Sequence, residues 1–306
     1  MKETKSELTL GPVLFNWAPE SWRDFYFRIA DEAPVTTVYL GEAICSKRAP
    51  LFEPRLAEVS ERLTKAGKTI VYTSLSEVMS KLDRDLVESV CAADNAVVEA
   101  NDGAALFYLR GRPHHIGPFI NAYNEVSLAV LARNGATNVC LPPEMPATAI
   151  GMLAPQSAKL GVTTEVQVFG RVGLALSARC YHARAHGRSK DSCRFVCEED
   201  RDGMVLRTLE NMPFLTVNGI QTMSYDYLSL IGELAELEEL GVRRFRLSPH
   251  ACDMVEVAEA FQAVLEDRLE APQGAERLSG LNLGAPLSNG FYHGTAGHRQ
   301  VPAGLH

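Results

Sequence analysis

The sequence predicts a (β/α)8 barrel of the TIM type. Short strand-like runs alternate with amphipathic helical runs almost to the end of the chain, which is typical of α/β folds with a parallel sheet. Most of these runs are continuously apolar, as expected for strands buried on both faces. An open doubly wound sheet, whole or split in two, is the alternative, but no glycine-rich dinucleotide fingerprint follows the first run. The eight expected strands span residues 9–16, 36–40, 69–73, 95–100, 115–121, 137–141, 163–169 and 243–247.

Helical periodicity fills the intervals between these runs. Apolar side chains recur on one stripe in residues 53–66, 227–240 and 253–269, which predicts a helix in each. Gly67, Gly135, Gly161 and Gly241 stand just before the next strand, where a left-handed residue often closes a helix. Each interval therefore reads as one βα unit.

The alternation predicts a single barrel domain over residues 1–306, with two irregular segments. More than seventy residues separate the seventh and eighth strands, and residues 171–225 form an insertion whose middle is polar and basic. Residues 271–306 are rich in Gly and Pro, which predicts an extended tail packed on the barrel.

Composition excludes several classes of protein. Apolar residues make up 46% of the 306 positions, which is enough to build a core and argues against disorder. The formal charge of −8 argues against a general nucleic-acid or anionic-membrane binder. No signal peptide and no apolar run of transmembrane length is recognisable, so we expect a cytoplasmic protein.

The cysteines carry the sharpest chemical signal. Cys180, Cys193 and Cys197 lie in the insertion with the spacing C-x12-C-x3-C, and Cys45 follows the second strand in GEAICSKR. In a barrel both loops emerge at the C-terminal mouth, so the four thiolates can converge. Such a set suits a [4Fe–4S] cluster or a tetrahedral zinc. The irregular spacing favours the cluster, as do the basic neighbours Lys47, Arg48, Arg179, Arg184, Arg188 and Arg194.

The other three cysteines are interpreted differently. Cys91 lies in a helical run and Cys140 in a strand run, which indicates buried thiols. Cys252 lies near the mouth but is interpreted as a small residue at a helix start. Unrelated buried thiols remain the alternative for the four-cysteine set as well.

The sequence EVQVFGRVGLALSARCYHARAHGRSKDSCRFVCEED, with YLGEAICSKR upstream, resembles the collagenase-like peptidase family U32. The likeness runs from about Val13 to the tail. Glu165, Gly170 and Cys180 match the peptidase signature, but the region of Leu174 lacks the cysteine that usually follows the glycine. This departure speaks against proteolysis.

The resemblance is strongest to the members that take part in ubiquinone biosynthesis without oxygen. It implies a [4Fe–4S] cluster held by Cys45, Cys180, Cys193 and Cys197, and ring hydroxylation with prephenate as the hydroxyl donor. It also implies a heterodimer with a UbiU-like sister subunit and an accessory lipid-binding protein that carries the quinone intermediate.

Further polar residues are expected at the mouth of the barrel, where functional side chains gather. For Asn101, Asp102 and Asn124 the alternative is helix N-capping. For Glu42 the alternative is a surface carboxylate paired with Lys47 or Arg48. The mouth candidates are Asn16, Trp17, Glu42, Asn101, Asp102, Asn121, Tyr123, Asn124, Glu144 and His250.

Two pairs of histidines suggest metal binding. His182 and His186 have the i, i+4 spacing that places two imidazoles on one helix face, although Arg184 rather than Glu stands between them. They line a path near the cluster or lie on a solvated face. His114 and His115 point to opposite faces of a strand, so one of them is expected in solvent. Glu42, Asn121 and His182 are the catalytic candidates.

Three functions follow from these observations: an iron–sulfur protein for oxygen-independent hydroxylation, a peptidase, and a scaffold clamped by zinc. The sequence contains neither an H-E-x-x-H motif nor a recognisable Ser–His–Asp signature. The first function is therefore the one we expect.

Overall fold

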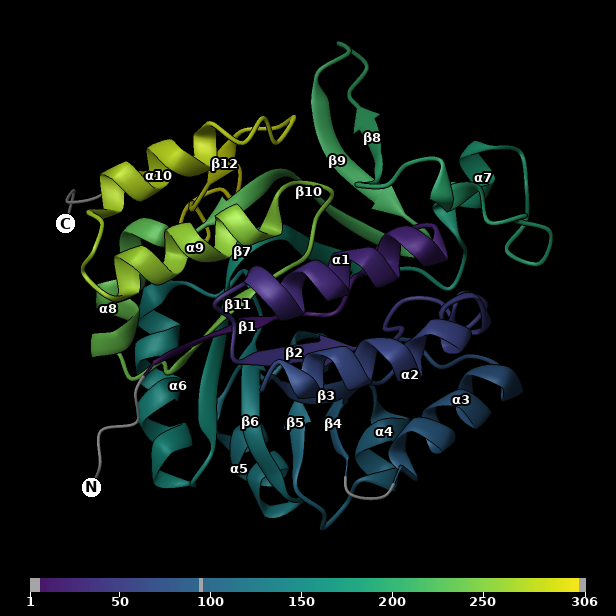
Figure 1. Cartoon of the computed structure of the whole chain (residues 1–306), viewed down its shortest axis with the longest axis horizontal. Helices are drawn as coiled ribbons and strands as arrows, with labels where there is room; N and C mark the ends of the chain where they lie inside the picture. The colour runs from purple at the N-terminus through teal and green to yellow at the C-terminus, as the bar shows by residue number, and fades with distance from the viewer. Residues whose placement is uncertain (1–5, 94–95, 303–306) are drawn as a thin grey trace.

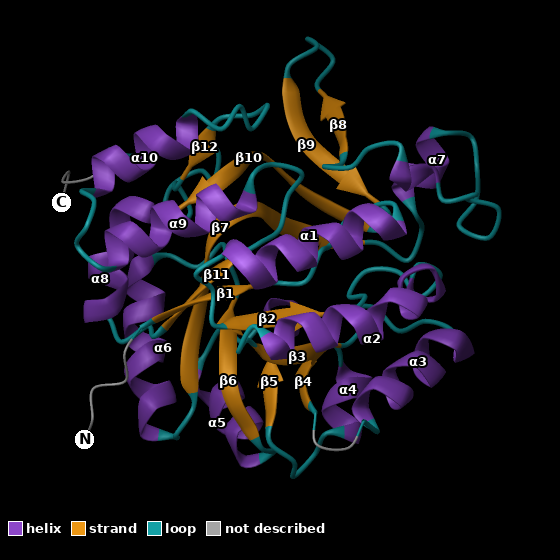
Figure 2. Ribbon diagram, viewed as in Figure 1, coloured by secondary structure: helices purple, strands orange, loops and turns teal. Residues whose placement is uncertain are grey.

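The computed structural model describes residues 6–93 and 96–302. Eight parallel strands form a closed barrel, because each strand pairs with the next and the last pairs with both the first and the seventh (Figures 1 and 2). The predicted (β/α)8 fold is thus confirmed. The barrel strands are β1 (Glu7–Leu10), β2 (Thr37–Leu40), β3 (Thr69–Thr73), β4 (Val97–Ala100), β5 (His114–Ile116), β6 (Ala136–Leu141), β7 (Thr163–Leu176) and β11 (Arg244–Leu247).

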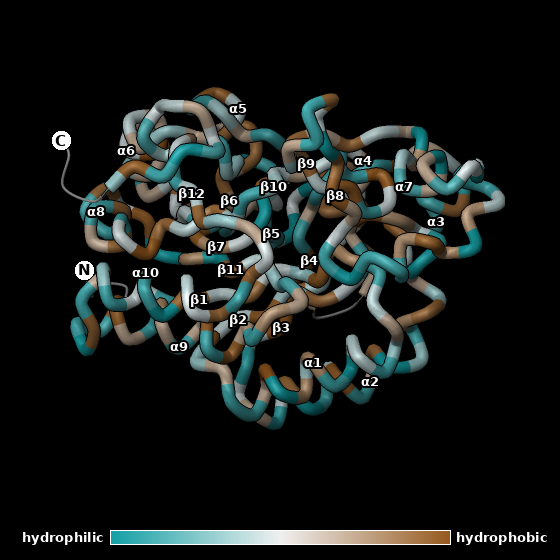
Figure 3. Tube along the Cα trace, turned by 90° about the horizontal axis from the view of Figure 1, so that it is seen from above, coloured by the Kyte–Doolittle hydropathy of each residue, from teal (hydrophilic) through white to brown (hydrophobic). Residues whose placement is uncertain are grey.

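Helices cover the outside of the barrel. Polar and apolar residues alternate along α1 and α2 (Figure 3), as expected for helices that bury one face. Among the described residues, none of the helices is both long and apolar enough to cross a membrane. The outer helices are α1 (Pro19–Glu32), α2 (Ala49–Lys65), α3 (Lys81–Cys91), α4 (Gly103–Tyr108), α5 (Glu125–Arg133), α6 (Ala147–Lys159), α8 (Leu234–Glu239) and α9 (Met254–Leu265).

Each of the eight predicted strand regions overlaps a barrel strand, but two strands end several residues before the predicted end. β1 ends at Leu10, whereas the prediction extended to residue 16. β5 ends at Ile116 and is followed by a 3-10 helix, Pro118–Ile120, because Pro118 fixes the backbone there. Residue 95, the first of the predicted fourth strand, lies outside the described residues.

The insertion between the seventh and eighth barrel strands builds an antiparallel extension of the sheet. β7 continues past the barrel and pairs with β10 (Gln221–Ser229), which pairs with β9 (Pro213–Asn218) and through it with β8 (Met204–Arg207). The segment before β8 holds α7 (Tyr181–Ala185) and a 3-10 helix, Val196–Glu198. The β8–β9 hairpin projects from the molecule, as Figure 2 shows.

The predicted helix over residues 227–240 is wrong in its first half. Residues 227–229 belong to β10, a 3-10 helix spans Ile231–Glu233, and α8 covers only Leu234–Glu239. Leu228, Ile231, Leu234 and Leu237 are all buried. Strand and helix residues alike contact the core here, so their apolar spacing imitates one helical stripe.

The tail differs from the extended chain that we expected. Residues 271–279 form α10 (Ala271–Ser279), which begins with Pro272 in its first turn and has a reciprocal cap between Glu270 and Gln273. The rest of the described tail is largely irregular, with β12 (Leu287–Ser288) added beside β10.

The prediction that one histidine of the pair His114 and His115 lies in solvent is also wrong, because both side chains are buried.

Candidate functional site

The loop after β2 presents Cys45 to the insertion. Gly41 has a φ of +130°, and a Cβ there would lie 3.2 Å from the carbonyl oxygen of Thr73, so only glycine fits this turn. Glu42 then folds the loop, because its Oε1 accepts hydrogen bonds from the backbone N–H of Ile44 at 2.7 Å and of Cys45 at 2.9 Å. The loop therefore has a fixed shape before α2 begins.

The other three cysteines come from the start and end of the segment around α7. Cys180 is the N-cap of α7, where its Sγ accepts from the N–H of Ala183 at 3.4 Å and lies 3.2 Å from the carbonyl oxygen of Gly219. Between Cys193 and Cys197 the backbone turns through left-handed residues, Arg194 and Phe195. This turn points both thiols back toward the barrel.

The structure brings the four predicted cysteines together. Cys45, Cys180, Cys193 and Cys197 line one small cavity between the β2–α2 loop and the insertion, although 135 residues separate the first from the second. In no set of three do all the sulfur atoms lie within 4.8 Å of one another, since among the described residues only a different group meets that distance. All seven cysteines are free thiols, and Cys91, Cys140 and Cys252 do not line the cavity.

A buried positive charge lies against the thiols. Arg48 is 1% exposed and donates to the Leu14 carbonyl at 3.2 Å and to Asn218 Oδ1 at 2.6 Å. None of the ion pairs recorded for the described residues includes this guanidinium. Burial opposes the charge of Arg48, but Glu42 and the thiols of Cys197 and Cys45 raise its pKa above the ordinary value.

Burial raises the pKa of the Cys45 and Cys180 thiols, and the charge of Arg48 partly offsets that rise. Of the predicted basic neighbours, Lys47 and Arg48 line the cavity, together with Lys190, which the sequence did not single out. Arg179, Arg184, Arg188 and Arg194 do not line it. The cavity is thus electropositive and sulfur-rich.

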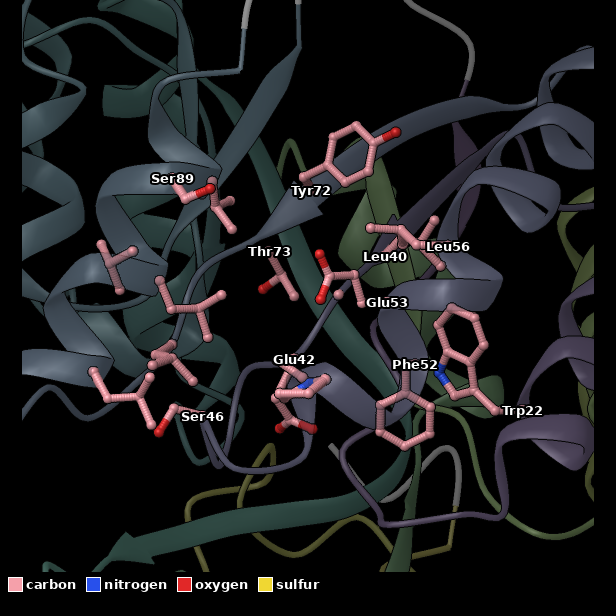
Figure 4. Close-up of a pocket in the computed structure, with 18 residues that line it drawn as sticks. Trp22, Leu40, Glu42, Ser46, Phe52, Glu53, Leu56, Tyr72, Thr73 and Ser89 are labelled. Carbon is pink, nitrogen blue, oxygen red and sulfur yellow. The ribbon is translucent and has the colours of Figure 1, made fainter.

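Glu42 lies on the other side of the same loop. It lines an apolar cavity of about 270 Å³ between α2 and α3, with Trp22 and Phe52 on one wall and Ser46 on the opposite one (Figure 4). Burial raises the pKa of the Glu42 carboxyl. The predicted ion pair of Glu42 with Lys47 or Arg48 is absent from the described ion pairs, because its carboxylate accepts backbone N–H groups instead.

A second cavity, of about 400 Å³, occupies the mouth of the barrel. Three predicted mouth residues line it: Asn121, Tyr123 and Glu144, with a hydrogen bond from the Tyr123 hydroxyl to Glu144. Arg171 and Arg246 also line it. Neither arginine was a candidate from the sequence, because Arg246 lies inside an apolar strand run and Arg171 is the first residue of the insertion.

Below this cavity, every strand of the barrel contributes one buried polar residue to a single network. Glu165 on β7 accepts from Tyr39 at 2.7 Å and pairs with Arg246 at 2.9 Å, and Arg246 also pairs with Glu99 at 2.6 Å. Burial alone would raise the pKa of Glu165, but Arg246 and the hydroxyl donors lower it to about 2. The remaining members are Thr9, Thr73, His115 and Asn138.

Four of the other mouth candidates have structural roles, whereas both polar atoms of the buried Asn16 amide lack a hydrogen-bond partner in the structure. Asp102 caps α4 and Asn124 caps α5, as the capping alternative predicted. Asn101 is not a cap, because its buried amide donates to Thr73 Oγ1 at 2.8 Å. Asn16 is buried, and the buried indole of Trp17 donates to the Arg201 carbonyl at 2.7 Å.

His250 connects the barrel to the insertion. Its Nδ1 lies 2.8 Å from Asp202, and its Nε2 accepts the backbone N–H of Arg171 at 2.9 Å. Gly170 has a φ of +110°, and a Cβ there would lie 2.9 Å from the same Nε2, which explains the glycine at that position. Both imidazole nitrogens are occupied, so His250 is not free to act as a general base.

Comparisons with known proteins gave matches among solved structures and one match to a sequence family. Among solved structures, the chain aligns with an uncharacterized B. cereus protein at 9% identity and a TM-score of 0.43, covering 91% of this chain and 66% of that one. It aligns with the DAHP synthase of Thermotoga maritima at 13% identity and a TM-score of 0.37, covering 93% of this chain and 72% of that one. It aligns with an enolase from Agrobacterium radiobacter at 13% identity and a TM-score of 0.36, covering 54% of this chain and 46% of that one. The chain thus spans about half of the enolase and just under two thirds of the B. cereus protein.

A sequence-family comparison is more specific. The profile of peptidase family U32 matches residues 18–301, which is almost the whole chain and includes all four cysteines of the cavity. This chain therefore belongs to peptidase family U32.

Proposed function

We propose that the chain is an iron–sulfur protein of the UbiV type, required for oxygen-independent ring hydroxylation in ubiquinone biosynthesis. The observation that carries the proposal is the cavity lined by four cysteines beside the buried guanidinium of Arg48. A buried charge without an ion-pair partner is costly, so Arg48 favours an anionic group in that cavity. Cys45, Cys180, Cys193 and Cys197 would hold a [4Fe–4S] cluster there.

The spacing of the sulfur atoms supports a cluster over a single zinc. A tetrahedral zinc has Zn–S distances of about 2.3 Å, which sets its thiolates about 3.8 Å apart. The four cysteine sulfurs lie more widely, since no three of them fall within 4.8 Å of one another. Four separate iron corners suit that wider arrangement.

When bound, a cluster with four cysteine ligands supplies one-electron transfer rather than an open coordination site. The chain's own residues set its surroundings. Arg48 offsets the negative charge of the thiolates, and the N–H of Ala183 donates to Cys180 Sγ. The loop of Glu42 separates the sulfur cavity from the apolar cavity between α2 and α3.

The mouth cavity is the proposed site for the hydroxyl donor, prephenate. Prephenate is a dicarboxylate, and Arg171, whose buried Nε has no hydrogen-bond partner in the structure, lines the cavity. Guanidinium groups bind carboxylates through charge-assisted hydrogen bonds. Asn121 and Tyr123 at the rim offer further polar contacts.

The proposed partner is a UbiU-like sister subunit, in a cytoplasmic complex that also receives the quinone intermediate from a lipid-binding accessory protein. The β8–β9 hairpin supports a protein partner, because Leu209, Met212 and Phe214 expose most of their side chains there. β8 is also an edge strand with one free side. Such an apolar, protruding edge is typical of an interaction surface.

A peptidase is the second candidate, since it is the activity in the family name. The pair formed by His250 and Asp202 is the arrangement closest to a catalytic dyad, but the N–H of Arg171 occupies the nitrogen that would activate a nucleophile. A scaffold clamped by zinc is the third candidate, and the sulfur spacing argues against it.

One purification separates these functions. Protein isolated without oxygen should be brown and contain about four iron and four sulfide per chain, as expected for a [4Fe–4S] cluster. A UbiU-like subunit should co-purify with it. A colourless protein with one tightly bound zinc would contradict the proposal.

A growth experiment tests the pathway. A strain without the gene should lack ubiquinone when grown anaerobically and make it normally in air. Normal anaerobic ubiquinone in that strain would contradict the biosynthetic role even if the cluster is present.

A further inference from the structure

A group of side chains that could hold a metal ion lies around α7, outside the lining of the sulfur cavity. The ligand atoms of His182, His186 and Asp200 all lie within 4.8 Å of one another. Neither histidine lines the cysteine cavity, although Ala183 between them does. The two imidazoles are stacked with an interplanar angle of 3°, as the i, i+4 spacing on a helix dictates.

Hydrogen bonds orient both imidazoles for a metal. Nδ1 of His182 lies 3.2 Å from the Val217 carbonyl oxygen, and Nδ1 of His186 lies 3.0 Å from the carbonyl oxygen of His182. A carbonyl only accepts, so each Nδ1 carries the hydrogen and each Nε2 keeps its lone pair. Histidines that bind metals are held in this way by a backbone carbonyl.

The lone pair of His182 faces a carboxylate. Its Nε2 lies 3.0 Å from Asp200 Oδ2 but has no hydrogen-bond partner, and the side chain is completely buried. Two electron-rich atoms at this distance repel each other unless a proton on Nε2 or a metal ion beside both relieves the repulsion. A proton would form an ion pair with Asp200, but the geometry here does not make a hydrogen bond from Nε2, which favours the metal ion. Nε2 of His186 faces a second carboxylate, that of Glu199, at 3.8 Å.

We propose that His182 Nε2, His186 Nε2 and Asp200 Oδ2 bind one divalent transition-metal ion, of the class of Zn²⁺ and Fe²⁺. Two imidazoles and one carboxylate suit these ions and are poor ligands for Mg²⁺ or Ca²⁺. Asp200 and His186 are partly exposed, which leaves room for water to complete the coordination. This site is separate from the four cysteines and does not depend on what they hold.

The proposed ion would join the two ends of the cysteine-bearing segment. His182 follows Cys180 by two residues, and Asp200 follows Cys197 by three. The buried amide of Asn218 reinforces the same junction, because it donates to the carbonyl oxygens of Cys197 and Asp200, both at 3.0 Å. The metal would therefore fix the separation of two cysteines in the sulfur cavity.

The test is metal binding by the full chain, purified anaerobically and treated with a chelator. Zn²⁺ is titrated in competition with a chromophoric chelator, and Co²⁺ serves as a spectroscopic probe. Because the four free cysteines of the sulfur cavity can also take up added metal, the wild type is compared with His186→Ala: it should bind one more equivalent of Zn²⁺ than that variant. Its Co²⁺ spectrum, after subtraction of the spectrum of His186→Ala, should show weak d–d bands without sulfur-to-metal charge transfer. His186→Ala and Asp200→Asn should each weaken Zn²⁺ binding at least about tenfold.

Two control variants match these changes outside the site. His298→Ala removes an exposed histidine and Asp191→Asn an exposed carboxylate of the same insertion, so both should keep wild-type affinity. Absence of the additional Zn²⁺ equivalent from the wild type would overturn the proposal. Unchanged affinity in His186→Ala and Asp200→Asn, or strong sulfur charge transfer in the Co²⁺ difference spectrum, would do the same.

Discussion

The centre of the barrel and the sulfur cavity both bury an arginine, and they neutralise it differently. Arg246 forms ion pairs with Glu99 at 2.6 Å and Glu165 at 2.9 Å, so the barrel supplies its own counter-charges. Arg48 is as deeply buried and donates to the oxygens of Leu14 and Asn218, but none of the ion pairs of the described residues includes it; the Glu42 carboxyl and the thiols of Cys197 and Cys45 raise its pKa from nearby. The barrel centre therefore supplies its own counter-charges, whereas the anionic group that we propose for the sulfur cavity would add to the partial compensation of Arg48 by Glu42.

This difference predicts which changes damage which region. Substitutions in the barrel network should lower the stability of the whole fold, whether or not the cysteines hold iron. Substitutions in the sulfur cavity should remove the metal and leave the barrel folded.

The largest expected effect is the loss of iron from the sulfur cavity. Cys193→Ala removes one of the four proposed ligands, so iron and sulfide per chain should fall to near zero after anaerobic purification. Cys91→Ala is the matched control, since Cys91 is buried in α3 away from the cavity. Full iron content in Cys193→Ala would contradict the ligand assignment, and far-ultraviolet circular dichroism should show an intact barrel in both variants.

Arg246→Met should cause the largest loss of stability. It leaves the carboxylates of Glu99 and Glu165 buried without their counter-charge, which costs about 3–5 kcal/mol. Arg62→Met is the control, because it removes an exposed pair with Asp31 and a contact of the guanidinium with the Phe27 ring, and it should cost about 1 kcal/mol or less. Urea unfolding measures both, and equal losses would show that the barrel network is not a special source of stability.

The pH dependence of stability tests the same network. The pKa of Glu165 is lowered from 4.5 to about 2 in the folded state, so the unfolded state binds the proton first as the pH falls. The stabilisation, about 3 kcal/mol at most, is fully present above pH 4.5 and is lost as the pH falls through about 2. In Glu165→Gln the unfolding free energy should change less between pH 5 and pH 3, and an unchanged slope would assign the acid sensitivity to other groups.

The sequence predicted the barrel because strand and helix patterns repeat, and it located the four cysteines because thiols in a polar insertion are conspicuous. It did not predict the network at the centre of the barrel. Arg246 and Tyr39 lie inside apolar strand runs, and only closure of the sheet brings them to Glu165, which a sequence pattern does not encode. The helix α10 of the tail was missed for a different reason. The Gly and Pro content of residues 271–306 predicted an extended chain, but proline is tolerated in the first turn of a helix.

The smallest expected effect separates two adjacent residues that the sequence treated alike. Asp102 caps α4 by accepting from the N–H of Ala104 at 2.7 Å, whereas Asn101 is tied into the barrel through Thr73. Asp102→Ala should therefore lower the unfolding free energy by about 1 kcal/mol, and Asp102→Asn should restore most of it, because asparagine caps equally well. Asn101→Asp places a carboxylate 3.2 Å from that of Glu99 and lacks the donating amide, so it should not be tolerated in the same way. Urea unfolding measures the loss of unfolding free energy in each variant. An equally small loss for Asn101→Asp and Asp102→Asn would contradict the distinction between a cap residue and a barrel residue.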